Sequence, residues 1–433
     1  MFLYSAGSAY SMDRKALKKL LSEVLEKIRP DESVIKRCEE TLKEIRAELR
    51  TRRISADAVL GGSIAKGTFL KNNYDCDIFV RFDRNRYKDE ELSEILQSAL
   101  SRFSPTRVKG SRDYFQFERQ GINFEVVPVF RIRSPRQAVN VTDVSPLHIS
   151  WVRDRIKKNP QLADEARLTR AFCRGIGVYG AESFIRGFSG HVLDILTIQY
   201  GGFLNLLSAS QKWRPPVVID PEKHQKGMAL LNLNASKREG PLILIDPVQP
   251  DRNAAAALSE EKFKLLVKKA GEFMKRPSHS FFFPKRKNIL PSEDTLVIEA
   301  VPISGNPDIA GCKLLKAFEF IKKGLEENYF KVEKAQFDWQ KGELARFAYK
   351  INKSSIRDAG QGKPVNRRGP PLSMEKHVLE FKKRHSAFYE KDGFIWAQDK
   401  RRYSDFVSCA TALLNDEYLE GKALSFRILN RKK

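Results

Sequence analysis

The sequence predicts a multidomain α+β protein. A chain of 433 residues with 41% hydrophobic content can bury the cores of about two to four domains. Helical and strand-like periodicities alternate in residues 1–140, helical periodicity dominates residues 141–257, and a mixed order returns in residues 258–353. Residues 354–433 begin with a stretch rich in Gly, Pro and Arg and continue as a basic tail with helical patterning. We therefore expect four regions with these boundaries.

The first region predicts two helices followed by a small mixed sheet. Apolar residues recur at helical spacing over residues 17–28 and 34–49, with Pro30 between them. ADAVLGGS then predicts a strand ending in a glycine turn, AKGTFL the start of a short helix, and CDIFVRF a buried strand. A helix is expected over residues 90–103, followed by two strands, YFQFER and INFEVVPVFRI, which a glycine turn joins.

The remaining regions change character twice. Three helical patterns follow one another: SPLHISWVRDRIKK, DEARLTRAFCRGIG and GHVLDILTIQYGGFLNLLSASQKW. A strand, LILIDPV, leads into DRNAAAALSEEKFKLLVKKAGEFMK, whose alanine run favours a helix. Residues 295–350 predict the order strand, helix, strand, strand, which suggests a compact α+β unit. Residues 354–373 predict a linker or loop, and HVLEFKKRHSAFYEKDGFIWAQDKRRYSDFVSCATALL predicts a basic helical tail that contains aromatic residues.

Two acids spaced by one residue are the first candidates for chemistry. In a strand Asp75 and Asp77 point to one face, while Cys76 and Ile78 face the core. Carboxylates this close repel each other unless a cation lies between them, so the pair is either a metal site or a costly accident. Mg²⁺ prefers oxygen ligands and commonly keeps waters and substrate phosphates in its shell. Glu125 is flanked by apolar residues in NFEVVPV, which predicts a third carboxylate from an adjacent strand.

The glycine turn just before these acids suits a phosphate. Gly62 allows close approach of the backbone, Ser63 offers a hydroxyl, and Lys66 adds an ammonium to the N–H groups that open a helix. Taken singly, such a turn is common, and a pair of acids at a strand end is often a solvated edge or a cap. Together they predict in-line attack of a hydroxyl on an α-phosphorus, assisted by two metal ions about 4 Å apart.

The charge and the cysteine content restrict the kinds of partner and metal site that we expect. The net charge of +24, from 78 Lys and Arg against 54 Asp and Glu, favours a polyanion such as a nucleic acid. The five cysteines form no CxxC pair, so neither a zinc site nor a disulfide framework is expected. No run approaches the roughly 18 apolar residues of a membrane span, and we expect a cytoplasmic protein with no membrane partner. The first eleven residues differ in character from the rest of the chain, which makes Met12 a candidate start.

Several motifs resemble one enzyme family. GGSIAKGTFLKNNYDCD is similar to the GS turn and paired acids of the polymerase-β nucleotidyltransferase superfamily. The archaeal-type (class I) CCA-adding enzymes, which are tRNA nucleotidyltransferases, contain segments that resemble, in order, SPLHISWV, RLTRAFCRGIGVYGAE, IRGFSGHVLDILTIQYGGF, DPVQPDRNAAAALS and RRGPPLSMEKHVLEFKKRHSAF. The resemblance runs from about residue 14 to beyond residue 400.

This resemblance implies a fold, a reaction and partners. The fold would comprise a catalytic head (1–140) built on a polymerase-β-like palm sheet, a helical, nucleotide-binding neck (141–257), an α+β body (258–353) and a tRNA-binding tail (354–433). The reaction would be template-independent addition of C, C and A to the 3′ end of tRNA from CTP and ATP, with release of pyrophosphate. The protein would contact the acceptor and T arms of tRNA. Family members often pair through their bodies or tails, so a homodimer is compatible with the resemblance.

The resemblance also implies roles for single residues. Asp75, Asp77 and Glu125 would bind two Mg²⁺ ions. The residues implied to bind nucleotide are Gly62, Ser63, Lys66, His148, Arg170, Tyr179, Arg252 and Asn253. Among these, Ser63 and Lys66 would contact the triphosphate, and Arg252 with Asn253 would meet the edge of the incoming base.

On the residues alone, other interpretations of the pocket stay open. His148 could cap or pack at a helix start, Tyr179 could be a turn aromatic, and Arg252 could pair with Asp251. The chain also departs from the family pattern. Asp75 stands where many members have glutamate, and Glu125 stands where the usual residue is aspartate.

Two basic positions of the pocket depart as well. Lys66 and Arg170 stand where arginine and lysine, respectively, are expected, so Lys66 keeps its charge but lacks the bidentate fork. Two alternatives to CCA addition remain open. One is a poly(A) polymerase or oligoadenylate synthetase-like nucleotidyltransferase, and the other is a tRNA-binding protein without activity.

Overall fold

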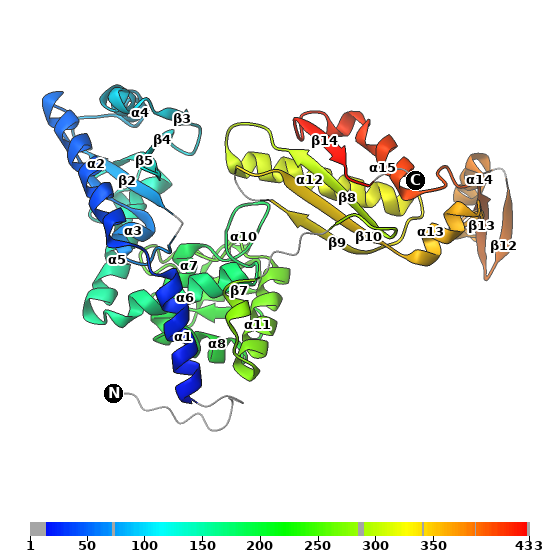
Figure 1. The fold of residues 1–433 in the computed structure, drawn as a ribbon, viewed down its shortest axis with the longest axis horizontal. Coiled ribbons are helices and arrows are strands. Elements are labelled where there is room, and N and C mark those ends of the chain that lie inside the picture. Colours follow the sequence, from blue (N-terminus) through cyan, green and yellow to red (C-terminus); the bar gives the residue numbers. More distant parts are fainter. Residues whose placement is uncertain (1–13, 72–73, 285–289, 340–341, 386, 431–433) are drawn as a thin grey trace. The chain divides into compact units, whose positions relative to one another are not determined.

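The chain forms two compact units, which we call unit 1 (residues 1–285) and unit 2 (residues 286–433). This computed structural model describes residues 14–71, 74–284, 290–339, 342–385 and 387–430 (Figure 1). Met12, the candidate start, lies outside the described residues.

A five-stranded sheet forms the N-terminal part of unit 1 (Figure 1), in the order β1-β2-β5-β4-β3. Its strands are β1 (Ala56–Leu60), β2 (Asp75–Phe82), β3 (Thr106–Val108), β4 (Tyr114–Arg119) and β5 (Ile122–Phe130). β2 and β5 run parallel, whereas the other neighbours run antiparallel. The sequence predicted all of these strands except β3, whose three residues are too few to show a period.

The two faces of this sheet are packed differently. Cys76 and Ile78 are fully buried beneath α2 (Glu32–Thr51) and α4 (Leu92–Ala99), as the alternation along the strand predicted. Phe79, on the opposite face, packs near α3 (Gly62–Lys66) and α5 (Ser145–Lys158). Because side chains alternate, Asp75 and Asp77 lie on this second face.

A second core in unit 1 gathers helices from distant parts of the sequence. Its helices are α1 (Arg14–Ile28), α5, α6 (Gln161–Gly175), α7 (Gly190–Tyr200), α8 (Phe203–Ser210) and α11 (Glu260–Lys275). Phe172 of α6 and Phe273 of α11, both fully buried, have ring centroids 5.6 Å apart. The boundary expected between residues 257 and 258 is therefore wrong, since α11 buries its apolar face in unit 1. α1 also packs here and not on the sheet.

The alanine run at 254–257 was expected to be helical but forms turns. Asn253 pairs with Ile245 in an isolated antiparallel bridge, and its Oδ1 accepts a hydrogen bond from Ala255 N at 2.9 Å, so the start of the alanine run belongs to a closed loop. The helix begins only at Glu260, where Ser259 caps it by accepting from Lys262 N. Short elements that the sequence did not predict precede this turn: β6 (Val217–Ile219), α9 (Ala229–Asn232) and α10 (Ala235–Arg238). The expected strand β7 (Leu242–Leu244) pairs in parallel with β6.

Unit 2 contains the predicted α+β arrangement. A four-stranded sheet in the order β14-β8-β10-β9 is covered by two helices. Its strands are β8 (Thr295–Val301), β9 (Val332–Asp338), β10 (Ala345–Ile351) and β14 (Ser425–Ile428), and the helices are α12 (Pro307–Glu327) and α15 (Phe406–Leu414). Because α15 and β14 join this core, the end of the expected tail belongs to the body.

The expected linker and helical tail are also wrong in part. A three-stranded sheet in the order β11-β13-β12 lies within residues 354–433. It comprises β11 (Val365–Pro371), β12 (Phe388–Lys391) and β13 (Phe394–Asp399), and α14 (Glu375–Arg384) packs beside β11, whereas α13 (Lys353–Gly360) buries Ala359 in the core of the four-stranded sheet. Arg368 pairs with Trp396 in register, and its guanidinium lies 3.5 Å from the centre of the Phe394 ring. Although the segment of β11 is rich in Gly, Pro and Arg, contacts with β13, which is distant in the sequence, thus stabilise it as a strand.

In the described part of the chain, no single helix is long and apolar enough to cross a membrane. Taken together, α7 and α8 would be long and apolar enough for a span, but the chain bends by 91° between them, at Gly201 and Gly202. Its apolar side chains belong to the helical core of unit 1.

Candidate active site

The glycine turn after β1 lies directly against a carboxylate. Gly62 has a φ of +55°, and a Cβ on this residue would lie 1.6 Å from Asp77 Oδ2. Gly61 N donates to Asp77 O at 2.7 Å, so the turn is bonded to β2. α3 then makes a single turn that ends at Lys66 and is capped by Gly67, with Ser63 partly exposed near its start. The sequence of the turn is thus explained by its contact with Asp77.

The three predicted carboxylates lie on two adjacent strands. In the parallel register of β2 and β5, Asp77 is opposite Glu125 and Asp75 is opposite Asn123. Burial raises the pKa of Asp77 to about 7, and the charges of Glu125 and Asp75 act in the same direction. The charge of Lys66 opposes this shift. The structure therefore confirms the predicted proximity of these acids.

Neutral amides support two of the carboxylates. Gln116 on β4 is paired with Glu125 across the sheet, and its Nε2 donates to Glu125 Oε1 at 2.6 Å. Asn123 Nδ2 donates to Asp75 Oδ1 at 3.4 Å. No pattern in the sequence indicated Gln116, because its contact depends on the register between two strands. Neither amide carries a charge that could balance the acids.

This donor set fits a divalent cation. It consists of carboxylate oxygens from Asp75, Asp77 and Glu125, and the missing Cβ at Gly62 keeps the backbone close to them. Burial and, next to it, the charges of Glu125 and Asp75 raise the pKa of Asp77, and a bound cation would instead favour its charged form. The residues present can therefore hold the metal that a nucleotidyl transfer requires.

Two cations expected at the triphosphate share one buried carboxylate. Lys66 Nζ lies 2.9 Å from Asp194 Oδ2, and Arg170 Nη2 lies 2.8 Å from both oxygens of Asp194. Asp194, on α7, is fully buried. Although burial would raise the pKa of Asp194, Arg170 and Lys66 lower it below its usual value. The cluster keeps one positive charge in excess and connects α3 to α6 and α7.

Tyr179 lies beside the same cluster. A Cβ on Gly190 would lie 3.0 Å from Tyr179 Oη and 2.9 Å from Arg170 Nη1, so both side chains approach the start of α7. The guanidinium of Arg174 lies 4.6 Å from the centre of the Tyr179 ring. The structure thus brings Lys66, Arg170 and Tyr179 together, as expected for one pocket.

A second carboxylate, Asp246, gathers three other side chains. Asp246 Oδ2 lies 3.0 Å from His148 Nε2, 3.0 Å from Arg252 Nη1 and 3.6 Å from His191 Nε2. Burial lowers the pKa of His191 to about 4, against the opposing influence of Asp246. The ligand atoms of His148, His191 and Asp246 lie within 4.8 Å of one another. A metal ion there would have to share Asp246 with the guanidinium of Arg252.

Asn253 has a different environment from its neighbour Arg252. Its Oδ1 accepts from Leu244 N and Ala255 N, and its Nδ2 donates to Lys237 O and Leu242 O, at 2.9–3.3 Å. Asn253 is buried. These bonds hold the turn that carries Arg252, and the expected contact of Asn253 with a base has no support in this arrangement.

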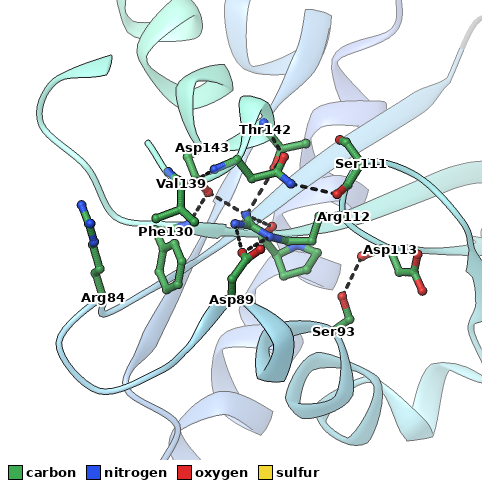
Figure 2. Close-up of polar contacts among 12 residues, drawn as sticks. Arg84, Asp89, Ser93, Ser111, Arg112, Asp113, Phe130, Val139, Thr142 and Asp143 are labelled. Atoms are coloured by element: carbon green, nitrogen blue, oxygen red, sulfur yellow. Dashed lines mark hydrogen bonds and ion pairs between the residues drawn. The ribbon is translucent and has the colours of Figure 1, made fainter. Parts of the chain in front are cut away.

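A buried arginine fixes the strand that carries Glu125. Figure 2 shows Arg112 between Asp89 and Asp143. Arg112 Nη1 donates to Pro128 O at 2.9 Å and to Asp143 Oδ1 at 2.6 Å, while Nε donates to Asp89 at 2.9 Å. Asp143 Oδ1 also accepts from Phe130 N at 2.8 Å. The end of β5 is thereby tied to the segment that leads into α5 and His148.

Two family models match unit 1. A nucleotidyltransferase domain matches residues 42–132, and the second domain of a tRNA nucleotidyltransferase matches residues 164–283. The first match contains the three carboxylates, and the second contains Arg170, Asp194 and Arg252. The second match ends close to residue 285, where unit 1 ends.

Relatives match most of the chain. It is 33% identical to the CCA-adding enzyme of Nanoarchaeum equitans, a match that covers 80% of this chain and 85% of that enzyme. The identity is 32% for the CCA-adding enzyme of Aeropyrum pernix, covering 89% and 83%, and 30% for that of Thermococcus gammatolerans, covering 90% and 86%. A solved structure of Cid1, named for RNA terminal uridylyl transferase activity, has a TM-score of 0.50 at 13% identity and covers 64% of this chain and 100% of that chain. This last likeness supports the fold alone.

Proposed function

Because the chain belongs to the archaeal-type CCA-adding enzymes, tRNA nucleotidyltransferases that add CCA to tRNA, we propose that it uses CTP and ATP through the residues of the candidate active site. The observation that carries the mechanism is the register of β2 and β5, which sets Asp77 opposite Glu125 with Asp75 on the same face. The proposed reaction is attack of the tRNA 3′-OH on the α-phosphorus of the nucleotide, with release of pyrophosphate.

The carboxylates have the first role. Asp75, Asp77 and Glu125 would hold two Mg²⁺ ions, which would activate the 3′-OH and stabilise the leaving pyrophosphate. Gly62 keeps the backbone close to Asp77, and Gln116 orients Glu125 through its hydrogen bond. Glu125 is one methylene longer than aspartate, and its amide partner limits the positions that this longer side chain adopts.

The triphosphate lies on the cationic side of the pocket. Ser63 donates its hydroxyl to a phosphate oxygen, and Lys66 and Arg170 supply the excess positive charge left after Asp194 has neutralised one of them. His148 and Tyr179 border the same space on its triphosphate and sugar side. A buried ion cluster with net positive charge attracts the polyanion without requiring each cation to contact a phosphate.

The base is read by a fixed guanidinium. The side chain of Arg252 is 41% exposed and bonded to Asp246 through Nη1. Its planar donors can pair with the acceptors of cytosine or adenine while disfavouring other base edges, which allows protein to replace a template. Asn253 supports the turn from which Arg252 extends.

The partner is tRNA, contacted at its 3′ end and along its acceptor and T arms. The charge of +24 favours its phosphates, and in unit 2 cation–aromatic pairs such as Arg368 with Phe394 can contact RNA. The enzyme acts on tRNA in the cytoplasm, and sedimentation tests whether two copies pair. Two other functions fit less well. A poly(A) polymerase or oligoadenylate synthetase is not favoured by the relatives, and intact carboxylates argue against an inactive tRNA-binding protein.

The test is incorporation of labelled CTP and ATP, with Mg²⁺, into three tRNAs that end at the discriminator base, at C and at CC. Products are read at single-nucleotide resolution for the wild type, for Asp75→Ala and for Glu118→Ala, which removes an exposed carboxylate on β4. Growth of each tRNA to CCA and no further, lost only in Asp75→Ala, is expected. Long A tails would show instead that the protein acts as a poly(A) polymerase. Tight binding without growth would leave a tRNA-binding protein.

A further inference from the structure

Asp246 is a buried carboxylate held by its own loop. Ile245 and Asn253 form an antiparallel bridge, and Asp246 N donates to Arg252 O at 3.0 Å, so the loop between them is closed at its base. Asp246 Oδ1 accepts from Val248 N at 2.9 Å and from Gln249 N at 3.1 Å. The carboxylate is fully buried. Its orientation is therefore set before any ligand arrives.

The second oxygen of Asp246 is directed at two residues of the nucleotide pocket. Asp246 Oδ2 lies 3.0 Å from Arg252 Nη1 and 3.0 Å from His148 Nε2. These two residues reach the carboxylate from separate elements, the loop itself and α5. Among the described residues, Asp246 is the one side chain bonded to the guanidinium of Arg252.

This anchor has two physical consequences for Arg252. A partly exposed arginine samples many rotamers, and fixing one edge of the guanidinium leaves its remaining donors in a defined direction. The negative charge of Asp246 also competes with a triphosphate for the same guanidinium. Without that charge, Arg252 would be attracted to the phosphates and would no longer present a fixed set of donors to a base.

We propose that Asp246 is a positioning residue for nucleotide selection, which holds Arg252 in the orientation that accepts CTP and ATP and excludes UTP and GTP. The inference rests on the proposed function, since it names what sets the specificity of that same site. Among the described residues, the side chain of Asp246 bonds to Arg252 and His148 and makes no bond to Asp77, Glu125, Lys66 or Arg170. Its loss should therefore change which nucleotide is added more than how fast the correct one is added.

The experiment compares Asp246→Asn with the wild type in single-nucleotide incorporation. The amide oxygen of asparagine, in place of Oδ1, still accepts from Val248 N and Gln249 N and remains near His148 Nε2, which lies 3.1 Å from Oδ1, whereas the NH₂ group in place of Oδ2 cannot accept from Arg252. With tRNA ending at the discriminator base and each of the four nucleotides, kcat/KM for CTP relative to UTP should fall by about tenfold or more. Asp251→Asn is the matched control, because this neighbour is 83% exposed and pairs with Lys237. The control should keep the wild-type ratio.

A double-mutant cycle shows whether Asp246 acts through Arg252. Arg252→Ala alone should lose discrimination, and adding Asp246→Asn to it should cause no further loss. Wild-type ratios in Asp246→Asn, or losses that multiply in the double variant, would overturn the inference while leaving CCA addition intact. Failure of the wild type to add C, C and A would instead overturn the proposed function. If Asp246→Asn does not fold, Asp246→Glu decides in the same assay, because it keeps the charge and displaces the anchor.

Discussion

The carboxylate of Asp77 leaves no room for a side chain at Gly62. A Cβ at residue 62 would lie 1.6 Å from Asp77 Oδ2, and the φ of +55° is itself unfavourable for residues other than glycine. The neighbouring Gly61 N–H is bonded to the carbonyl of Asp77 at 2.7 Å. The glycine turn and the central carboxylate are therefore one structural feature, although the first belongs to the start of α3 and the second to β2.

Gly62→Ala should abolish most nucleotide incorporation while the protein stays folded. The added methyl group must displace either the turn or the Asp77 carboxylate, and a misplacement of about 1 Å in a catalytic group can reduce the rate by about 100-fold. Gly67→Ala is the control, because Gly67 also has a positive φ of +69° but a Cβ there would meet nothing within 4 Å. The rates of CTP addition are compared between variants that have the same thermal midpoint of unfolding. Equal losses in both variants would attribute the effect to backbone strain instead of to Asp77.

The alternation of side chains along a strand allowed the carboxylate face to be predicted. Asp75, Asp77 and Glu125 lie within strands whose flanking residues are apolar, so their face follows from the sequence. The sequence did not indicate Asp194 and Asp246, because Asp194 meets Lys66 from 128 residues away along the chain and Asp246 meets His148 from 98 residues away. The same limit explains β11, whose strand structure depends on pairing with β13. Local sequence specifies faces of elements, but it does not specify which distant side chains meet.

Asp194→Asn should strongly destabilise unit 1. The change leaves Lys66 and Arg170 buried with one negative charge fewer, and breaking a buried ion pair from one side typically costs about 3–5 kcal/mol. Removing one cation as well, in Asp194→Asn with Lys66→Met, should recover part of that loss. Denaturant unfolding measures both effects. Glu260→Gln, which removes an exposed pair with Lys264, should cost about 0.5 kcal/mol or less. An equally small cost for Asp194→Asn would contradict the role of this residue as a buried counter-ion.

His191 should contribute a loss of stability as the pH is lowered from about 6.5 to 4, whereas Asp77, whose pKa is raised to about 7, contributes in the opposite direction over this range. Burial lowers the pKa of His191 to about 4 in the folded protein, while an unfolded histidine has an ordinary pKa of 6.5. Between these values the unfolded chain binds a proton that the folded chain does not, so acid favours unfolding. Between pH 6.5 and 4 the thermal midpoint of His191→Gln should therefore shift less toward acid instability than that of the wild type, whereas His377→Gln, at an exposed position on α14, should behave like the wild type. If His191→Gln leaves the pH dependence of the thermal midpoint unaltered, groups other than His191 cause that dependence.

The affinity for tRNA should fall steeply with salt. A chain with a net charge of +24 that neutralises several phosphates releases bound counter-ions, and six to ten such contacts lower affinity by roughly 10³ to 10⁵ between 50 and 200 mM salt. Binding of tRNA is measured by fluorescence anisotropy without nucleotide, so that catalysis does not interfere. Arg368→Ala should reduce the slope, because it removes a cation on the β11-β13-β12 sheet, whereas Asp77→Asn should leave tRNA affinity nearly unchanged. A flat response to salt would contradict a phosphate-dominated interface and would direct attention to stacking on the aromatic residues of that sheet.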